Sequence, residues 1–139
     1  MALSVEQYMT PNPVIIQEDD DIGRVAELMN PEKFRHLPVV NAQQEVVGMI
    51  SDRDLRNIQT ALDFVQNVLG EGTSKLKVKD IMHQTVISVA PQQSLKEAAL
   101  LLVENKIGAL PVVAERKLVG ILSYTDILRA FAEHAHQLG

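Results

Sequence analysis

The sequence contains an internal duplication. Three segments recur in the same order: residues 5–10 (VEQYMT) as 78–83 (VKDIMH), 36–40 (HLPVV) as 109–113 (ALPVV), and 48–55 (GMISDRDL) as 120–127 (GILSYTDI). The first two pairs are separated by 73 residues and the third by 72, so the spacing within each copy is preserved. Shared order and spacing are not explained by a chance similarity of apolar segments, and they predict two similar structural units.

Each copy predicts the element order β-α-β-β-α. An extended segment precedes a helix that begins after Asp21 in the first copy and after Ser94 in the second, where Ser94 and Glu97 form a capping-box pattern. Two strands rich in β-branched residues follow, joined by a polar turn, and a last helix begins after Ser51 or Ser123. The expected extended segments are residues 14–16 and 86–89. The expected strands are residues 37–40 and 46–50 in the first copy and 110–113 and 118–122 in the second, joined by turns at residues 41–45 and 114–117.

One unit of roughly 50 residues buries too little apolar surface to be stable alone. We therefore expect an α+β fold in which two pseudo-symmetric units pack sheet to sheet around a shared core. Any cleft at the interface between the units is then formed twice. The expected boundaries are residues 5–58 for the first motif, 59–77 for a helical connector and loop, and 78–133 for the second motif.

The connector predicts a long helix with an apolar seam. We expect Leu55 and Ile58 to cover the core of the protein itself. Two interpretations stay open for the rest of the seam, which either covers the same core or forms a self-association surface: Leu62, Val65 and Leu69. Glycines at positions 70 and 72 are expected to end this helix.

The composition excludes several classes of function. With 13 basic and 18 acidic residues the net charge is −5, which disfavours an extended nucleic-acid surface but allows a local pocket for one nucleotide. The absence of cysteine excludes disulfides and cysteine-ligated zinc. The sequence shows no basic and apolar leader and no apolar run of the ~18 residues that span a bilayer, so we expect a cytoplasmic protein without a membrane span.

Neither metal ligation nor catalysis is predicted. The acidic run at residues 18–21 leads directly into a helix and is interpreted as a solvated helix N-terminus rather than a metal site. His134 and His136 are two residues apart and do not share a helical face. Because no G-x-S-x-G, P-loop, H-E-x-x-H or G-x-G-x-x-G pattern occurs, we expect a protein without catalytic residues or a required cofactor.

The duplicated pattern Ser-x-x-Asp has two interpretations, at Ser51 with Asp54 and at Ser123 with Asp126. The serine can cap the helix while the aspartate lies near the positive end of the helix dipole. The same geometry suits a phosphate at the free N–H groups of the helix, with the carboxylate accepting hydrogen bonds from both hydroxyls of a ribose. The glycine ahead of each serine would let a flat base approach the backbone.

Basic residues distinguish the two copies. The first copy has Arg35, His36 and Arg53 where the second has Gly108, Ala109 and Thr125. If phosphates bind, the copy that contains Asp54 is therefore expected to prefer them. Taken singly, Arg35 and Arg53 are explained equally well as ordinary surface charge. A solvated or capping role is the default for His36 and His83.

The duplicated segments resemble a tandem pair of cystathionine-β-synthase (CBS) domains, called a Bateman module. The resemblance covers residues 5–131 and rests on YMTPNPV, HLPVV and GMISDRDL, followed by IMHQTVISV, ALPVV and GILSYTDI. It implies two β-α-β-β-α motifs, assembly into a disc-shaped homodimer, and binding of an adenosyl ligand such as AMP, ADP, ATP or S-adenosylmethionine in the clefts between the motifs.

The resemblance also implies a role for each matching residue. Asp54 and Asp126 would hold the ribose hydroxyls, and Ser51 and Ser123 would meet phosphate or ribose. His83 replaces the hydroxyl residue that Thr10 provides in the first copy. The implied nucleotide-binding residues are Thr10, Val14, Arg35, His36, Leu37, Pro38, Ser51, Asp52, Arg53, Asp54, His83, Ile87, Ala109, Leu110, Pro111, Ser123, Thr125 and Asp126.

The resulting hypothesis is a non-catalytic sensor that binds an adenine nucleotide and signals through a regulated protein partner or through its own assembly. Few residues lie outside the repeat, so no attached effector domain is expected. The alternative is a protein-interaction or dimerisation module that binds no ligand, and an enzyme is the third hypothesis.

Overall fold

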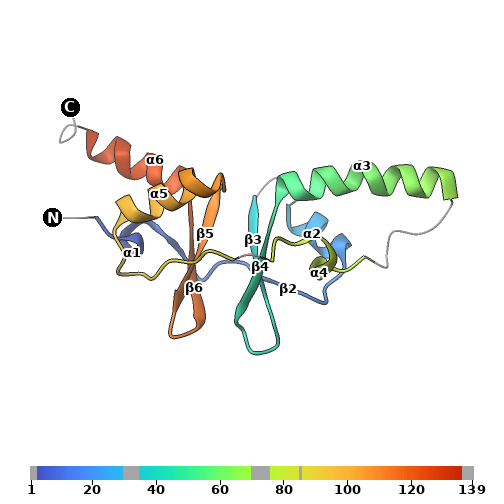
Figure 1. Ribbon diagram of the computed structural model, residues 1–139, viewed down its shortest axis with the longest axis horizontal. Helices are drawn as coiled ribbons and strands as arrows, with labels where there is room; N and C mark the ends of the chain where they lie inside the picture. The colour runs from blue at the N-terminus through green and yellow to red at the C-terminus, as the bar shows by residue number, and fades with distance from the viewer. Residues whose placement is uncertain (1–2, 30–34, 70–75, 85, 136–139) are drawn as a thin grey trace. The chain divides into compact units, whose positions relative to one another are not determined.

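The structure is a computed structural model that describes residues 3–29, 35–69, 76–84 and 86–135. Side chains at positions 59, 62, 65, 66 and 69 lie outside this description, as do Gly70 and Gly72. The described chain contains helices and two three-stranded sheets, which confirms the predicted α+β class (Figure 1).

Two compact units divide the chain, and each is built around one sheet. The Ser51 unit comprises Val14–Val86, and the Ser123 unit comprises Met1–Pro13 together with Ile87–Gly139. The first residues of each sequence copy thus pack in the unit that contains the other copy's Ser–Asp pair. The motif boundaries inferred from the sequence stay a prediction.

The Ser51 unit contains the sheet β2-β3-β4, in which β2 is parallel to β3 and β3 is antiparallel to β4. Its elements are β2 (Ile16–Gln17), α2 (Ile22–Met29), β3 (His36–Val40), β4 (Val46–Ser51), α3 (Asp52–Leu69) and α4 (Val78–Ile81). Its core is formed by Ile16, Val25, Met29, Leu37, Val39, Ile50 and Val78. The register places His36 opposite Ser51 at the end of β4, directly beside the start of α3.

The Ser123 unit contains the sheet β1-β6-β5, which is antiparallel throughout. Its elements are α1 (Val5–Tyr8), β1 (Thr10–Pro11), α5 (Leu95–Asn105), β5 (Ala109–Ala114), β6 (Lys117–Ser123) and α6 (Tyr124–Glu133). The predicted cap is confirmed, because the Ser94 side chain accepts a hydrogen bond from the N–H of Glu97. Of the expected extended segment 86–89, only Val89 forms a bridge, to Val112.

Backbone hydrogen bonds hold the exchanged opening segments in place. In the Ser123 unit the N–H of Val5 donates to the carbonyl of Gln93, and the N–H of Leu95 donates to the carbonyl of Leu3. In the Ser51 unit the N–H of Val78 donates in the same way to the carbonyl of Asp20. The one-turn helices α1 and α4 thus occupy equivalent places, each at the start of the first long helix of its unit.

The duplicated glycines serve this exchange. A Cβ atom added at Gly48 would lie 2.5 Å from Met82 Sδ and 3.0 Å from the carbonyl oxygen of His83. At Gly120 it would lie 2.6 Å from Met9 Sδ and 3.0 Å from the carbonyl oxygen of Thr10. The proposal that these glycines leave room for a flat base is therefore wrong, because a methionine of the other sequence copy fills that space.

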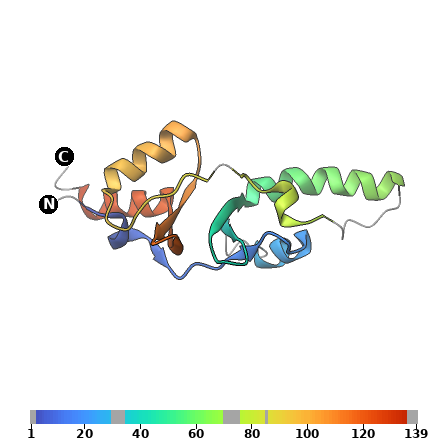
Figure 2. The ribbon, with the colours of Figure 1, turned by 60° about the horizontal axis from the view of Figure 1, so that its bottom comes forward.

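The connector helix extends well beyond its sheet (Figures 1 and 2). Leu55 packs against the core of the Ser51 unit, as predicted, and Ile58 is half-buried. The side chains on which the self-association alternative depends (Leu62, Val65 and Leu69) lie outside the described part of the structure, and so do the glycines expected to end the helix.

Candidate functional site

Ser51 and Asp54 form a reciprocal cap at the start of α3. The N–H of Ser51 donates to Asp54 Oδ2 over 2.9 Å, and the N–H of Asp54 donates to Ser51 Oγ over 3.1 Å. The predicted capping role is confirmed. The hydrogen bond from Ser51 fixes the direction of the Asp54 carboxylate, which is still 18% exposed to solvent.

His83 approaches the other oxygen of the same carboxylate. Its Nε2 atom lies 3.0 Å from Asp54 Oδ1, and its side chain is 72% exposed. The position is fixed by the backbone, because the N–H of His83 donates to the carbonyl of Met49 and the N–H of Met49 donates to the carbonyl of His83. Both oxygens of Asp54 therefore have a partner.

The N–H groups at the start of α3 are less available than the sequence suggested. The N–H of Asp52 donates to the carbonyl of Arg35 over 2.8 Å, and the N–H of Asp54 is used by Ser51. The N–H of Tyr124 at the start of α6 donates in the same way to the carbonyl of Gly108 over 3.0 Å. The hypothesis of free helix N–H groups for a phosphate is therefore wrong at these positions.

Charged groups surround this helix start. Burial lowers the pKa of His36, although the nearby carboxylates of Asp52 and Asp54 oppose this effect. Burial acts to raise the pKa of Asp52, but the hydrogen bond from Arg56 and its positive charge outweigh burial and hold that pKa below its usual value. Arg35 and Arg53 are exposed. Arg35 directly precedes β3, and Arg53 is the second residue of α3.

The Ser123 unit repeats the cap with different partners. The N–H of Ser123 donates to Asp126 Oδ2 over 2.8 Å, and Ser123 Oγ lies 2.6 Å from Thr125 Oγ1. Arg129 lies 3.4 Å from Asp126 Oδ1, where His83 stands beside Asp54 in the other unit. The carboxylate of Asp126 is buried, so this copy is the more closed of the two.

The contact of Arg129 with Asp126 could not be predicted by comparing the two sequence copies. The equivalent position in the first copy is Asn57, so the repeat gave no signal. Its position three residues after Asp126 on a helix would have predicted the contact.

The predicted residues divide between the two units. Ten lie in the Ser51 unit: Val14, Arg35, His36, Leu37, Pro38, Ser51, Asp52, Arg53, Asp54 and His83. Eight lie in the Ser123 unit: Thr10, Ile87, Ala109, Leu110, Pro111, Ser123, Thr125 and Asp126. The exchange of Thr10 and His83 between the two units was not predicted from the sequence. Leu37 and Leu110 are fully buried, so they offer a ligand their backbone and not their side chains.

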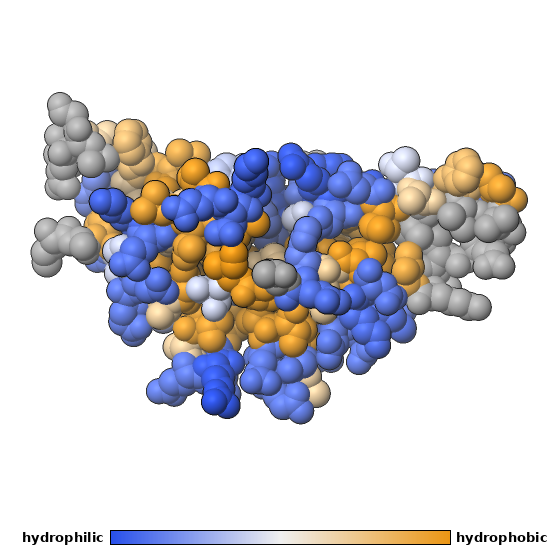
Figure 3. Space-filling view, viewed as in Figure 1, coloured by the Kyte–Doolittle hydropathy of each residue, from blue (hydrophilic) through white to orange (hydrophobic). Residues whose placement is uncertain are grey.

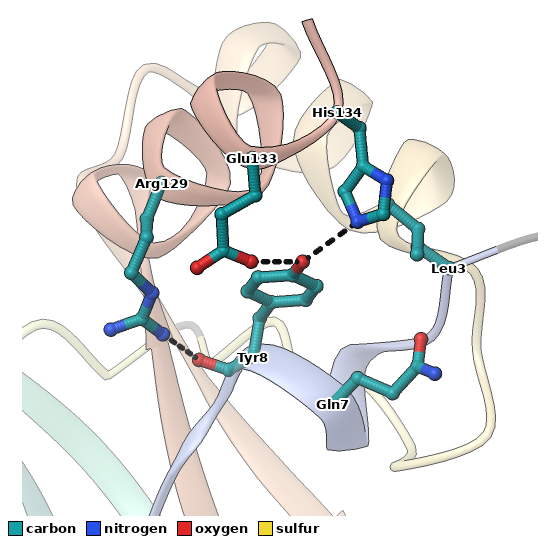
Figure 4. A pocket seen from close by; sticks show the side chains of 6 residues that line it. All are labelled: Leu3, Gln7, Tyr8, Arg129, Glu133 and His134. Carbon is teal, nitrogen blue, oxygen red and sulfur yellow. Dashed lines mark hydrogen bonds between the residues drawn. The ribbon is translucent and has the colours of Figure 1, made fainter. Parts of the chain in front are cut away.

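A hollow of about 530 Å³ lies at the other end of α6 (Figure 4). The hydroxyl of Tyr8 donates to Glu133 Oε2 over 2.7 Å and lies 3.0 Å from His134 Nε2. Arg129 donates to the carbonyl of Tyr8 over 3.1 Å, and its guanidinium carbon lies 5.6 Å from the centre of the Tyr8 ring. These contacts tie α1 to the end of α6. No sequence motif pointed to them.

The acidic run before α2 pairs with lysines. Lys77 Nζ lies 2.8 Å from Asp21 Oδ1, and Lys79 Nζ lies 3.0 Å from Asp19 Oδ1. Among the described residues there is no group of three His, Cys, Asp or Glu side chains placed to hold a metal ion. Within the same residues no helix is long and apolar enough to cross a membrane.

A sequence profile of the CBS domain matches residues 5–60 and 78–133, which together make up most of the chain. The chain therefore belongs to the CBS domain family and contains two CBS domains in tandem, as the sequence resemblance predicted.

Solved structures of other CBS-pair proteins resemble this one. A Vibrio cholerae protein assigned to acetoin utilization (AcuB) has a TM-score of 0.83 and 32% identity, over 99% of this chain and 98% of that one. CBSX2, a protein known from Arabidopsis thaliana, was solved in complex with AMP, with a TM-score of 0.75 and 30% identity over 94% and 97% of the two chains. The CBS domain pair of MJ0100, in complex with 5′-methylthioadenosine and S-adenosyl-L-methionine, has a TM-score of 0.77 and 25% identity over 92% and 98%.

Curated relatives differ in length. A CBS domain-containing protein of Dictyostelium discoideum is 30% identical over 92% of this chain and 90% of its own length. Other relatives are much longer: the chain spans 20% of a homoserine O-acetyltransferase from Methanocorpusculum labreanum, to which it is 35% identical over 80% of its own length. It also spans 23% of an inosine-5′-monophosphate dehydrogenase from Methanocaldococcus jannaschii, at 29% identity over 89% of its own length.

Proposed function

We propose that this chain is a non-catalytic regulatory module that binds an adenosine-containing ligand beside Ser51 and Asp54. The observation that carries the proposal is the fixed and partly exposed carboxylate of Asp54 at the start of α3, in a family with relatives solved with AMP or S-adenosylmethionine. A carboxylate that already has one oxygen fixed by Ser51 is oriented to accept hydroxyl donors on the other.

The charges near Asp54 favour a ligand with phosphate. Arg35 and Arg53 are exposed, and one guanidinium group can donate two parallel hydrogen bonds to the oxygens of a phosphate. Because the N–H groups of Asp52 and Asp54 are in use, the arginines and the α3 dipole are the groups that would balance the phosphate charge. AMP, ADP and ATP all carry this chemistry.

The other parts of the ligand have proposed partners in the same unit. Asp54 would accept the ribose hydroxyls, and Ser51 would contact ribose or phosphate. The adenine ring would lie against the backbone at Leu37 and Pro38 and the exposed side chain of Val14. His36 and His83 also lie in the proposed site, where His83 occupies the oxygen of Asp54 that a ribose hydroxyl would use.

We propose a weaker site in the Ser123 unit. Asp126 is buried and has Arg129 at its second oxygen, and no arginine stands where Arg35 and Arg53 stand in the first copy. The proposed contacts at this site are Thr10, Ile87, Ala109, Leu110, Pro111, Ser123, Thr125 and Asp126. A charged nucleotide would therefore bind first beside Asp54.

Regulation requires the ligand to favour one of two states of the protein, because only differential affinity can shift an equilibrium. A regulatory role is supported by two relatives that are enzymes, because the segment that matches this chain is only a small part of each enzyme's length. We therefore propose that ligand binding in the cytoplasm is passed to a regulated protein partner.

Calorimetric titration with AMP, ADP, ATP and S-adenosylmethionine tests the proposal. We expect Asp54→Asn, which keeps the size of the side chain but removes its charge, to abolish most of the nucleotide binding. The matched variant Asp126→Asn should leave the tighter binding event in place. Absence of binding by every adenosyl compound up to millimolar concentration, in wild-type protein that is folded by circular dichroism, would exclude the proposal.

A protein-interaction module without a ligand is the second candidate. The observation in its favour is a group of exposed apolar side chains on α5 and α6, among them Val103 and Leu128. This alternative predicts normal assembly and partner binding by the Asp54→Asn/Asp126→Asn double variant, together with no heat of nucleotide binding by the wild type.

A further inference from the structure

The hollow at the end of α6 is lined by neither of the two Ser–Asp pairs. Its volume of about 530 Å³ lies in the range of small-molecule sites. The residues that line it come from the opening segment of the chain and from α6 and its end: Leu3, Gln7, Tyr8, Arg129, Glu133 and His134 (Figure 4). Polar side chains lie among apolar ones over the Ser123 unit, so its surface offers hydrogen bonds as well as apolar contacts (Figure 3).

The hydroxyl of Tyr8 is already used inside the protein. An ionised carboxylate only accepts hydrogen bonds, so this hydroxyl donates its one proton to Glu133 Oε2. The same hydrogen bond raises the pKa of the phenol, which keeps it protonated at neutral pH. The phenol oxygen lies 3.0 Å from His134 Nε2 and therefore accepts from an N–H at that nitrogen. A ligand in the hollow thus meets the charged groups around Tyr8 rather than its hydroxyl.

Arg129 and Glu133 bring opposite charges to the hollow. They are four residues apart on α6, a spacing at which such charges often pair with each other. Tyr8 holds both instead, because Arg129 Nη2 donates to its carbonyl oxygen over 3.1 Å and Glu133 accepts from its hydroxyl. Within the described part of the chain, Arg129 forms its ion pair with Asp126, at 3.4 Å, rather than with Glu133.

Each of the two charged groups has capacity for a further partner. Nη2 makes both contacts of Arg129, and a guanidinium has additional N–H donors at Nη1 and Nε. Glu133 accepts through Oε2, and its carboxylate has a second oxygen, Oε1. The side chain of Arg129 is 55% exposed, and Glu133 is exposed as well. The hollow therefore presents a cation and an anion about one helical turn apart.

A ligand that carries a negative and a positive group a few bonds apart matches this arrangement. A simple anion would be repelled by Glu133, and a simple cation would be repelled by Arg129. An α-amino acid carries its carboxylate and its ammonium group on one carbon atom. A guanidinium donates two parallel hydrogen bonds to a carboxylate, and a carboxylate accepts from an ammonium group.

We propose that this hollow binds a free α-amino acid, with the ligand's carboxylate on Arg129 and its ammonium group on Glu133. The side chain of the amino acid lies toward Leu3 and Gln7, which line the rest of the hollow. This site does not depend on the proposed nucleotide site beside Asp54, which lies in the other unit.

Isothermal titration calorimetry with the protein L-amino acids, up to millimolar concentration, tests the proposal. We expect an L-amino acid to bind the wild type and to bind Glu133→Gln about tenfold or more weakly, because a hydrogen bond to a charged group is lost. The matched control is Glu104→Gln, which removes the same charge from an exposed position on α5 and should bind like the wild type. Absence of binding by every L-amino acid, or equal binding by Glu133→Gln, in protein folded by circular dichroism, would overturn the proposal.

Two analogues of the amino acid that binds test the assignment of its charges. Its α-carboxamide lacks the negative charge, and the corresponding des-amino acid lacks the positive charge. We expect each analogue to bind about tenfold or more weakly than the amino acid itself. An analogue that bound as tightly as the amino acid would contradict a ligand with two charges.

Ultraviolet difference spectroscopy on Tyr124→Phe tests the place of binding. Tyr8 is the only phenol left in this variant, and the chain contains no tryptophan. We expect the absorption of Tyr8 to change over the same amino-acid concentrations that produce the heat of binding. Heat of binding without a change in the Tyr8 absorption would show that the amino acid binds elsewhere.

Discussion

His83 Nε2 and Asp54 Oδ1 lie 3.0 Å apart, so a residue from the second sequence copy holds the carboxylate oxygen that faces away from Ser51. A ribose hydroxyl bound at Asp54 would have to share or displace this contact. At exposed sites such a pair contributes about 0.2–1 kcal/mol. We expect His83→Thr, which introduces the residue of the equivalent position in the first copy, to raise the affinity for adenosine by up to about fivefold.

Adenosine is the ligand for this test because it has no phosphate, so no attraction between His83 and a ligand phosphate enters the comparison. Isothermal titration calorimetry measures the affinity of His83→Thr for adenosine. The control is Gln84→Ala, which changes the neighbouring exposed residue. A lower affinity in His83→Thr would show that the histidine supports the ribose rather than competing with it.

Substitution by alanine is expected to change the free energy of unfolding in opposite directions at Gly48 and Gly23. An alanine Cβ at position 48 would come within 3.0 Å of the backbone oxygen of His83, so the exchanged segment must shift. We expect Gly48→Ala to lower the free energy of unfolding by about 1–3 kcal/mol. Gly23 lies in α2 with nothing within 4 Å of the added atom, and Gly23→Ala should raise stability by about 0.5–1 kcal/mol.

Urea unfolding of both glycine variants measures the difference. If Gly48→Ala were as stable as the wild type, the close packing of Met82 against β4 would not be needed to hold the opening segment of the second copy.

The local elements were predictable because their signals are local. Ser51 with Asp54, and Ser94 with Glu97, are caps that follow from spacing of three residues alone, and the structure confirms both. The fold class followed from the duplication, because two similar sequences were expected to adopt two similar units.

The exchange of opening segments was not predictable in the same way. Met9 and Met82 occupy equivalent positions in the two copies, so nothing in the sequence says which copy each will pack against. The glycines at positions 48 and 120 were the available signal, since glycine within a strand often marks close approach of another chain segment. The space that the glycines suggested for a ligand is filled by Met82 and Met9 of the protein itself.

His36 gives a pH dependence with a defined sign. Burial lowers its pKa in the folded protein, so the unfolded chain takes up a proton first as the pH falls through the ordinary histidine value of about 6.5. The free energy of unfolding therefore falls on acidification in this range. The lowered pKa of Asp52 affects stability only near and below the ordinary aspartate value of 3.8, so the two effects occur in separate pH ranges.

Thermal unfolding at about pH 7.5 and about pH 5.5 measures this effect. We expect the fall in Tm between the two pH values to be smaller in His36→Asn than in the wild type by a few degrees. His83→Thr keeps the half-buried His36 and should retain that part of the pH dependence. The same fall in His36→Asn as in the wild type would show that burial of this imidazole does not affect stability.

Tyr8 makes the stability of the protein depend on pH in the alkaline range. Its hydrogen bond to Glu133 raises the pKa of the phenol above 10.0, burial and the negative charge of Glu133 act in the same direction, and Arg129 opposes them. The stability that this contact contributes is present below the ordinary tyrosine pKa and is lost as the pH rises through the raised value. The chain contains only two tyrosines and no tryptophan, so Tyr124→Phe leaves Tyr8 as the sole absorbing phenol.

Ultraviolet titration of Tyr124→Phe should therefore show a midpoint above the usual value of 10.0. Adding Glu133→Gln removes both the charge and the strong acceptor, and the midpoint should move down. An unchanged midpoint in the Glu133→Gln background would mean that the end of α6 is not tied to α1 in solution. Because α1 leads directly into β1, which pairs with β6 ahead of Ser123, loss of this tie would also loosen the strand that positions the second Ser–Asp pair.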